Sequence, residues 1–246
     1  MSIKTILVSQ PKPSDAKSPY FDLAKKYNLK IDFRSFIHVE GVDAQEFRTQ
    51  KIDLSKHTAV ILTSKTAIDH YFRIAEEMRF EVPDSMKYFC ISEAIAYYLQ
   101  KYVAYRKRKI FHGRQTITDL IDTLKKHKKE TFLLPCTDIL RDRIPTTLED
   151  NGINYSKAVL YRTVASDLSD LESVSYDMLV FYSPGGIESL LKNFPGFKQN
   201  KTVIAAFGPT TANAIVKNKL RLDLHAPQPN APSMTGAIEN FVKTKK

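Results

Sequence analysis

The sequence lacks tryptophan and contains only two cysteines and eight glycines in 246 residues. Cys90 and Cys136 lie far apart beside apolar runs, so we expect two buried free thiols in a reducing compartment rather than a disulfide. No apolar run reaches the ~18–20 residues that a membrane-spanning helix requires. The amino-terminal segment has only Ile6, Leu7 and Val8 as a continuous apolar run, which is typical of a first strand and not of a signal peptide. These features predict a cytoplasmic protein without a membrane partner.

Several common functional signatures are also missing. The sequence has no GxGxxG or Walker A spacing, which disfavours a nucleotide, and no GxSxG nucleophile elbow. No two histidines have the spacing of metal ligands on one helix face, so we expect no metal site. The six histidines are His38, His57, His70, His112, His127 and His225. If the protein is an enzyme, its chemistry must therefore depend on binding geometry and on a weak acid such as tyrosine.

Acidic residues are fewer than basic ones. The chain has 37 Lys and Arg against 27 Asp and Glu, a formal net charge of +10. Such a charge favours nucleic acid, an anionic membrane or a polyanionic small molecule as partner, although it also serves simple solubility. The sequence contains no zinc-finger spacing, helix-turn-helix pattern or aromatic-interleaved RNA motif, so nucleic acid is supported by charge alone.

Apolar β-rich runs alternate with runs of helical period through most of the chain. Strands are predicted at Thr5–Ser9, Lys30–Phe36, Ala59–Ser64, Lys87–Ser92, Lys109–Phe111, Thr131–Pro135, Tyr155–Val164, Met178–Ser183, Thr202–Phe207 and Arg221–His225. Helices are predicted at Tyr20–Tyr27, Ala44–Gln50, Lys65–Met78, Glu93–Tyr102, Thr116–His127, Arg143–Asp150, Gly186–Asn193, Pro209–Asn218 and Ser233–Lys243. This alternation is typical of an α/β fold with mostly parallel sheets.

The same strand-turn-helix pattern occurs in both halves of the chain. "AVILTSKTAIDHYF", which begins at Ala59, resembles "MLVFYSPGGIESLL", which begins at Met178, and three further units match in pattern. The sequence thus predicts two similar α/β halves, one from about Lys4 to His127 and one from about Thr131 onward. Duplication explains the matched turns better than the general rhythm of α/β proteins, which remains the alternative.

Small residues dominate the turns that follow the predicted strands. In an open parallel sheet, ligands bind beyond the carboxyl ends of the strands. Ser and Thr there cap the next helix, and the remaining N–H groups with the helix dipole favour an anion. The residues are Gln10, Thr63, Ser64, Ser92, Ser183, Pro184, Gly185, Gly186, Gly208, Pro209, Thr210 and Thr211. They predict a ligand with several carboxylates or phosphates, unless they act only as caps.

Tyr161, in "KAVLYRTVASDL", lies near the end of a long predicted strand. A polar stretch, Ser166 to Ser175, follows it, and a linker between domains is expected to begin there. The tyrosine either packs on a face of the sheet or takes part in function, and the pattern favours neither.

Together these residues resemble the uroporphyrinogen-III synthase (HemD-like) family over essentially the whole chain. The resemblance rests on the Thr63-Ser64 turn, "YRT" at Tyr161, "FYSPGGIESL", and "FGPTTANAI" followed by "APSMTGAIENF". It implies two flavodoxin-like parallel-sheet domains joined by a two-stranded linker. One domain would comprise residues 1–35 and 167–246 and the other residues 40–160, with linkers at 36–39 and 161–166.

The resemblance also implies an activity. The family cyclises hydroxymethylbilane with inversion of ring D and loss of water, a lyase reaction of tetrapyrrole (haem) biosynthesis that uses no cofactor and no metal. Tyr161 would be the catalytic proton donor. The implied substrate-binding residues are Thr63, Ser64, Lys65, Ser92, Ser183, Pro184, Gly185, Gly186, Gly208 and Thr211. The protein is expected to act as a cytoplasmic monomer on a small molecule, not on nucleic acid.

Two departures from the family pattern keep an alternative open. Ser92 and Ile95 stand where the family usually has Gly and Thr, and Gln10 stands where an Arg is common. Three basic side chains, Lys12, Lys65 and Arg141, would compensate. The alternative is a non-catalytic bilobal protein that binds a polyanionic small molecule as a sensor or regulator, and a basic nucleic-acid-binding protein is the third possibility.

Overall fold

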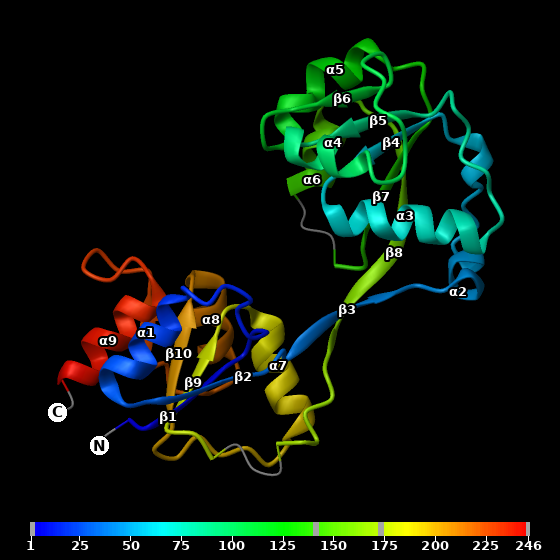
Figure 1. Cartoon of the computed structure of the whole chain (residues 1–246). Coiled ribbons are helices and arrows are strands. Elements are labelled where there is room, and N and C mark those ends of the chain that lie inside the picture. Colours follow the sequence, from blue (N-terminus) through cyan, green and yellow to red (C-terminus); the bar gives the residue numbers. More distant parts are fainter. Residues whose placement is uncertain (1–2, 140–142, 172–174, 245–246) are drawn as a thin grey trace. The chain divides into compact units, whose positions relative to one another are not determined.

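The computed structural model describes residues 3–139, 143–171 and 175–244. The chain divides into two compact units (Figure 1). Unit 1 comprises Met1–His38 and Thr163–Lys246, and unit 2 comprises Val39–Arg162. Unit 1 is therefore built from both ends of the chain, and unit 2 is a continuous segment between them.

Unit 1 is a parallel five-stranded sheet with helices on both faces. In order across the sheet, the strands are β2 (Lys30–Phe33), β1 (Thr5–Val8), β9 (Met178–Phe181), β10 (Val203–Phe207) and β11 (Leu224–Ala226). Helices α1 (Pro19–Tyr27) and α9 (Met234–Thr244) pack on each other and share one core with the sheet (Figure 1). Helices α7 (Pro184–Asn193) and α8 (Pro209–Lys217) pack on each other and bury a second core.

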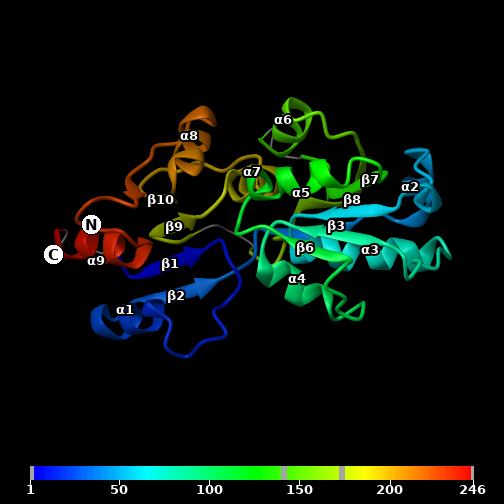
Figure 2. The same cartoon turned by 90° about the horizontal axis from the view of Figure 1, so that it is seen from above.

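Unit 2 has a six-stranded sheet. In order, its strands are β3 (Ile37–Gly41), β8 (Tyr155–Ala165), β7 (Phe132–Thr137), β4 (Ala59–Leu62), β5 (Lys87–Cys90) and β6 (Ile110–His112). Helices α2 (Ala44–Thr49), α3 (Lys65–Glu77) and α4 (Glu93–Leu99) bury one core with the sheet. On the opposite face (Figure 2), α5 (Ile121–Lys126) and α6 (Arg143–Asp150) bury another. Two short 3₁₀ turns, Leu54–Lys56 and Ile117–Leu120, complete the unit.

The two sheets have the same topology, which explains the repeated pattern in the sequence. The order β2-β1-β9-β10-β11 in unit 1 corresponds to β8-β7-β4-β5-β6 in unit 2. Each half of the chain contributes three consecutive strands to one sheet and its first strand-helix-strand segment to the other. The predicted α/β fold with two parallel-sheet domains is confirmed.

One predicted strand differs from the structure where the chain passes from unit 1 to unit 2. The predicted strand Lys30–Phe36 ends at Phe33, and a separate strand, β3, begins at Ile37. The break occurs because Phe36 leaves the strand line and packs in the core of unit 1, 5.8 Å from the ring of Phe181. β3 then pairs with β8, whose 11 residues carry the chain back from unit 2.

Two predicted helices also differ from the structure. The predicted helix Glu93–Tyr102 ends at Leu99. The predicted helix Thr116–His127 begins as a 3₁₀ turn, because the Asp119 carboxylate accepts hydrogen bonds from the backbone N–H and the hydroxyl of Thr116 and so tightens this first turn. Among the residues that the structure describes, no helix combines the length and apolarity needed to cross a membrane.

Asp177 connects β1 to β9. Its Oδ2 accepts hydrogen bonds from the backbone N–H groups of Lys4 and Thr5, at 2.8 and 2.9 Å, and from the Thr5 hydroxyl at 3.1 Å. Burial by itself would raise the pKa of this carboxyl, but the three hydrogen bonds outweigh it and hold the pKa below its usual value. The lowered pKa means that the ionised form stabilises the fold above the unfolded-state pKa, and that this contribution is lost as the pH falls through the folded-state pKa.

We therefore expect Asp177→Asn to lower the free energy of unfolding at pH 7 by about 1–2 kcal/mol. The difference from the wild-type protein should begin to shrink below pH ~4, where the carboxyl takes up a proton on unfolding, and should be lost as the pH falls through the lowered folded-state pKa. Urea denaturation at pH 7 and pH 3 measures both values. Glu81→Gln, at an exposed position, is the control and should show no comparable loss at pH 7. An Asp177→Asn deficit that is equal at both pH values would contradict this electrostatic explanation.

Candidate active site

The turn after β4 combines a helix cap with a contact to Tyr161. Ser64 is the N-cap of α3, and its Oγ accepts a hydrogen bond from the Ala67 N–H at 3.0 Å. The same Oγ lies 3.4 Å from the Tyr161 hydroxyl. Thr63 and Ser64 are half-buried. The predicted capping role is thus confirmed for Ser64, whose hydroxyl also reaches the predicted proton donor.

Tyr161 lies in β8 opposite Thr137 of β7. It is half-buried, and its ring stacks on the imidazole of His70 with 5.1 Å between centroids and 19° between planes. Burial raises the pKa of the Tyr161 phenol; the contact with Ser64 lowers it in part, and the nearby Cys136 raises it. The phenol is therefore protonated at neutral pH and able to donate a proton.

Lys65, the first residue of α3, places a cation beside this turn. Its Nζ lies 5.2 Å from the centre of the Tyr98 ring, a cation–π distance. The Tyr98 hydroxyl donates to the Asp69 carboxylate at 2.9 Å, which orients the ring. The Tyr102 hydroxyl donates to the same carboxylate at 2.6 Å. Asp69, Tyr98 and Tyr102 were not predicted, because their contacts join α3 to α4 and its carboxyl-terminal turn, and no motif marks them.

Ser92 differs from Ser64. It is the N-cap of α4, but its side chain makes no capping hydrogen bond. The residue after it, Glu93, belongs to an open hollow of about 630 Å³ that is lined by Glu93, His112, Gly113, Arg114 and Asp119. Basic and acidic groups are mixed here, so this part of the edge is less suited to an anion than the Ser64–Lys65 turn.

In unit 1, the turn after β9 is shaped by glycine. Ser183 is the N-cap of α7, with Pro184 as the first helical residue, and its side chain makes no capping hydrogen bond. A Cβ at Gly186 would lie 3.3 Å from the Phe181 ring and 3.5 Å from the Ser9 Oγ, so glycine keeps this turn close to the strand ends. Gly185 has looser surroundings, because an added Cβ there would lie 3.5 Å from the Ile37 side chain, an ordinary contact distance. The half-buried Ser183 hydroxyl therefore lies at a helix N-terminus without a capping partner.

The turn after β10 depends on the backbone conformation of Gly208. Gly208 has φ +83° and ψ 154°, a conformation that is essentially restricted to glycine, and its N–H donates to the Ala226 carbonyl at 2.7 Å. Thr211 is only 1 % exposed. It belongs to the first turn of α8, and its place in a ligand site stays a prediction.

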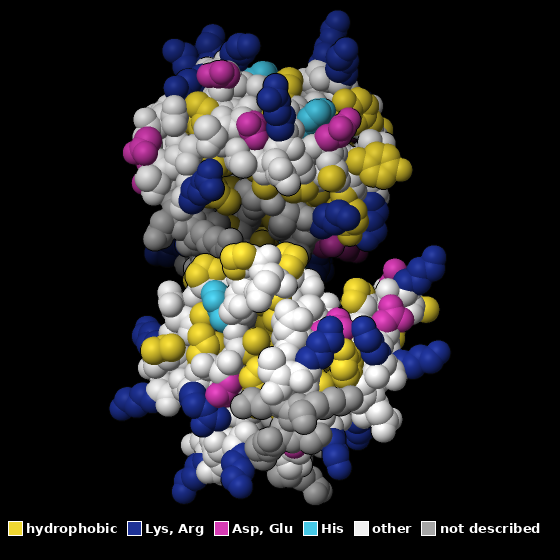
Figure 3. All heavy atoms as spheres, turned by 90° about the vertical axis from the view of Figure 1, so that its left-hand side faces the viewer, with side chains coloured by type: hydrophobic (Ala, Val, Ile, Leu, Met, Phe, Trp, Pro, Cys, Tyr) yellow, Lys and Arg dark blue, Asp and Glu magenta, His cyan; other side chains and the backbone are white. Residues whose placement is uncertain are grey.

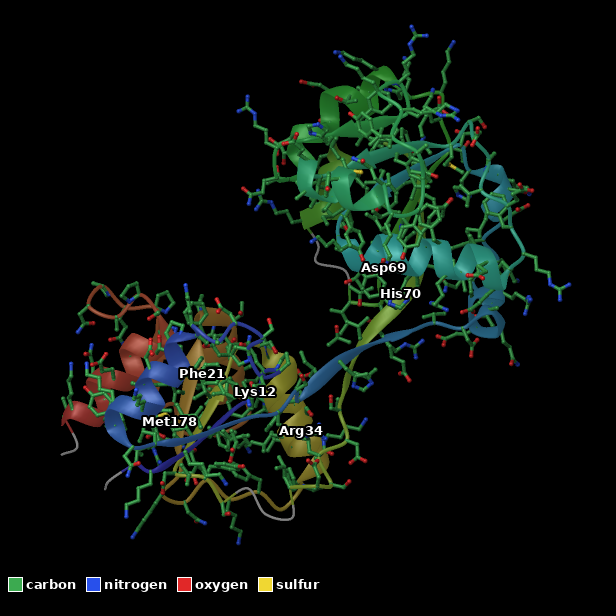
Figure 4. The ribbon with its side chains drawn as sticks, viewed as in Figure 1. Lys12, Phe21, Arg34, Asp69, His70 and Met178 are labelled. Atoms are coloured by element: carbon green, nitrogen blue, oxygen red, sulfur yellow. The ribbon has the colours of Figure 1, made fainter. Side chains whose placement is uncertain are left out.

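Of the remaining candidates, Gln10 and Lys12 follow β1 and are both exposed. Lys12 is labelled in Figure 4, and Arg141 lies outside the described residues. On the face shown in Figure 3, Lys and Arg side chains project from many points of both units, with acidic side chains among them. Among the described residues, no group of His, Cys, Asp and Glu side chains has a geometry that would hold a metal ion.

Comparison with known proteins identifies the family. The family model HEM4, described as uroporphyrinogen-III synthase HemD, matches residues 21–236. The chain belongs to the uroporphyrinogen-III synthase (HemD) family. The resemblance seen in the sequence is thereby confirmed.

One curated protein and two solved structures are also similar to this chain. Uroporphyrinogen-III synthase of Saccharomyces cerevisiae is 27% identical over 146 residues, 52% of this chain and 52% of that protein, so the match spans about half the length of the curated relative. The crystal structure of uroporphyrinogen-III synthetase from Helicobacter pylori superposes with a TM-score of 0.60 at 17% identity, over 98% of this chain and 100% of that one. A mutant uroporphyrinogen III synthase from Thermus thermophilus gives 0.52 at 14% identity, over 99% and 100%. These two structures share the fold.

The backbone of the Gly208 turn gives a stability prediction. Because φ and ψ at Gly208 are strained for any L side chain, we expect Gly208→Ala to lower the free energy of unfolding by about 1–3 kcal/mol. Gly196→Ala is the matched control: its added Cβ would meet nothing within 4 Å and its φ is ordinary, so its effect should stay within about 0.5 kcal/mol. Chemical denaturation of both variants measures the difference. Equal stabilities would show that the turn does not depend on glycine.

Proposed function

We propose that this protein is a uroporphyrinogen-III synthase, which converts hydroxymethylbilane into uroporphyrinogen III and water. Membership of the HemD family supports the proposal, as does the protonated Tyr161 next to Ser64 and Lys65. We further propose that it acts as a cytoplasmic monomer without a cofactor. The single observation that carries the chemistry is the 3.4 Å contact of the Tyr161 hydroxyl with Ser64, because it places a weak acid at the carboxyl edge of a parallel sheet.

Substrate binding in this proposal depends on anion recognition at strand ends. The bilane carries acetate and propionate groups on every ring, and N–H groups at helix N-termini bind carboxylates well. In unit 2, Thr63, Ser64, Lys65 and Ser92 would contribute. In unit 1, the Ser183–Gly186 turn and the first turn of α8, to which Gly208 leads and Thr211 belongs, would contribute. The task of the protein is then to hold a flexible chain in one reactive geometry, which lowers the barrier by orientation.

Tyr161 would supply the proton that the departing hydroxyl needs. As the phenol O–H bond and the hydroxymethyl C–O bond break, water leaves and a phenolate faces a cationic methylene-pyrrole. Attack by the substituted carbon of ring D gives a spiro intermediate, which reopens and closes with ring D inverted. The ring carbon that forms the last bond releases a proton, and this proton restores the phenol, so the step balances. A phenol with a raised pKa is a mild acid, which limits acid-promoted scrambling of the pyrroles.

The activity itself is tested by incubation with freshly generated hydroxymethylbilane, followed by oxidation and separation of the porphyrin isomers. We expect the III isomer with the protein and the I isomer, from uncatalysed closure, without it. Thermal unfolding in the presence of uroporphyrinogen measures binding separately. Stabilisation by this polyacid without formation of the III isomer would instead indicate a non-catalytic binding or regulatory protein, and stabilisation only by oligonucleotides would contradict both.

Tyr161→Phe tests the proposed proton transfer. The substitution keeps the ring and its stack on His70 and removes only the hydroxyl, so folding and binding should be preserved. One positioned proton transfer contributes roughly 10²–10⁴-fold, and a water molecule in place of the hydroxyl reduces the loss, so we expect turnover to fall about tenfold or more. Tyr155→Phe is the control, because Tyr155 starts the same strand and its hydroxyl donates to the Glu149 carboxylate at 3.0 Å. Wild-type formation of the III isomer by Tyr161→Phe would remove Tyr161 from the mechanism.

A further inference from the structure

His70 and Arg73 form a cluster against Tyr161 that the family resemblance did not predict. His70 lies on α3 (Figure 4), and its imidazole covers one face of the Tyr161 ring, with 5.1 Å between centroids. One helical turn later, Arg73 donates from Nε to the His70 Nδ1 at 3.1 Å. The two side chains are neighbours on the helix surface because residues three apart lie on the same face.

Arg73 is itself anchored by the strands that enter and leave unit 2. Its Nη2 donates to the carbonyl of Val42, which follows β3, at 2.7 Å. The same nitrogen donates to the carbonyl of Leu160, which directly precedes Tyr161 in β8, at 3.2 Å. Its Nη1 pairs with Glu77 on α3. The guanidinium is therefore held by three segments of the fold, and the position of His70 follows from it.

The hydrogen bond from Arg73 also determines the form of the imidazole. A guanidinium is always a donor, so the His70 Nδ1 must be an unprotonated acceptor and the neutral ring carries its proton on Nε2. Burial lowers the pKa of His70 and the charge of Arg73 lowers it further, while Asp69 and Glu77 raise it by less. The ring is neutral at pH 7, and a neutral ring stacks on a phenol without introducing a buried charge.

Gly41, at the end of β3, leaves room for the cluster. A Cβ there would lie 2.8 Å from the Arg73 Nη2 and 3.0 Å from the His70 Cε1. Both distances are shorter than ordinary contacts, so any side chain at position 41 would displace atoms of the cluster. The half-buried His70 and Arg73 are thus bounded by α3, β3 and β8 together.

We propose that His70 is a positioning residue for Tyr161: its neutral imidazole, held by Arg73, covers one face of the phenol and fixes the direction of the hydroxyl. The expected effect of His70 on turnover rests on the proposed function, whereas its effect on the Tyr161 phenol does not. A phenol that rotates away from Ser64 would transfer its proton less often, and small displacements of a reacting group cost large factors in rate.

The test compares His70→Ala with His70→Phe. The alanine removes the stack, whereas the phenylalanine keeps an aromatic ring over Tyr161 and loses only the acceptor for Arg73. Titration of tyrosinate absorbance, with the matching Tyr161→Phe double variant subtracted, isolates the Tyr161 phenol without any substrate. Circular dichroism limits the titration to pH values at which each variant stays folded.

We expect His70→Ala to lower the pKa of the Tyr161 phenol, because water then reaches the ring face that the imidazole covered. His70→Phe should retain most of the wild-type pKa. In turnover, His70→Ala should lower kcat about tenfold with KM changed less than about twofold, and His70→Phe should recover part of kcat. Phe72→Ala is the matched control: it removes a stack with Tyr102 from the same helix, at 4.4 Å, and should leave the Tyr161 titration unchanged.

An unchanged Tyr161 titration in His70→Ala, or a shift of equal size in Phe72→Ala, would overturn the proposal. If the titration shifts as expected but Tyr161→Phe retains wild-type turnover, the positioning of Tyr161 by His70 is supported and its role as proton donor fails. The two proposals can therefore fail independently.

Discussion

The structure depends on the insertion of a distant strand into the middle of each sheet. In unit 1, β1 lies between β2 and β9, with Ile6 opposite Met178. The Asp177 carboxylate accepts the N–H of Thr5 across a sequence separation of 172 residues. In unit 2, β7 lies between β8 and β4 in the corresponding place. Apart from β3, each sheet combines three strands from one half of the chain with a strand pair from the other half, so the chain passes between the units twice. The segments β3 and β8 follow from this exchange, and Tyr161 lies in one of them.

This constraint also explains which parts of the fold could be predicted. The alternation of apolar runs and amphipathic helices, such as Ala59–Leu62 followed by Lys65–Glu77, is local and appears directly in the sequence. The turn chemistry at Ser64 and Gly208 is local as well, because capping and a positive φ select residue types. β3 was missed as a separate strand because most of its residues are exposed and no alternation of buried residues marks it.

The candidate site was only partly predictable for the same reason. Tyr161 and Ser64 were found from strand-end positions, but their 3.4 Å contact joins residues 97 apart. His70 was dismissed as one of several scattered histidines, because its relevance comes from β8 packing against α3 and not from any neighbour in sequence. The burial of Thr211 could not be predicted either. Its sequence motif places it directly after a strand, and only the packing of α8 leaves it 1 % exposed.

The hydrogen bonds of Arg73 connect the strands between the units to the surroundings of Tyr161. A single guanidinium is bonded to carbonyls on either side of the passage between the units, at Val42 and Leu160, and to the imidazole that covers Tyr161. Any change that separates Val42 from Leu160 must break one of these hydrogen bonds or move the guanidinium, and a moved guanidinium no longer fixes His70. The geometry of the phenol is thereby coupled to the pairing of β3 with β8. Tyr161 lies in β8, the strand of the second crossing, so the pairing of strands that joins the units also sets the surroundings of the proposed proton donor.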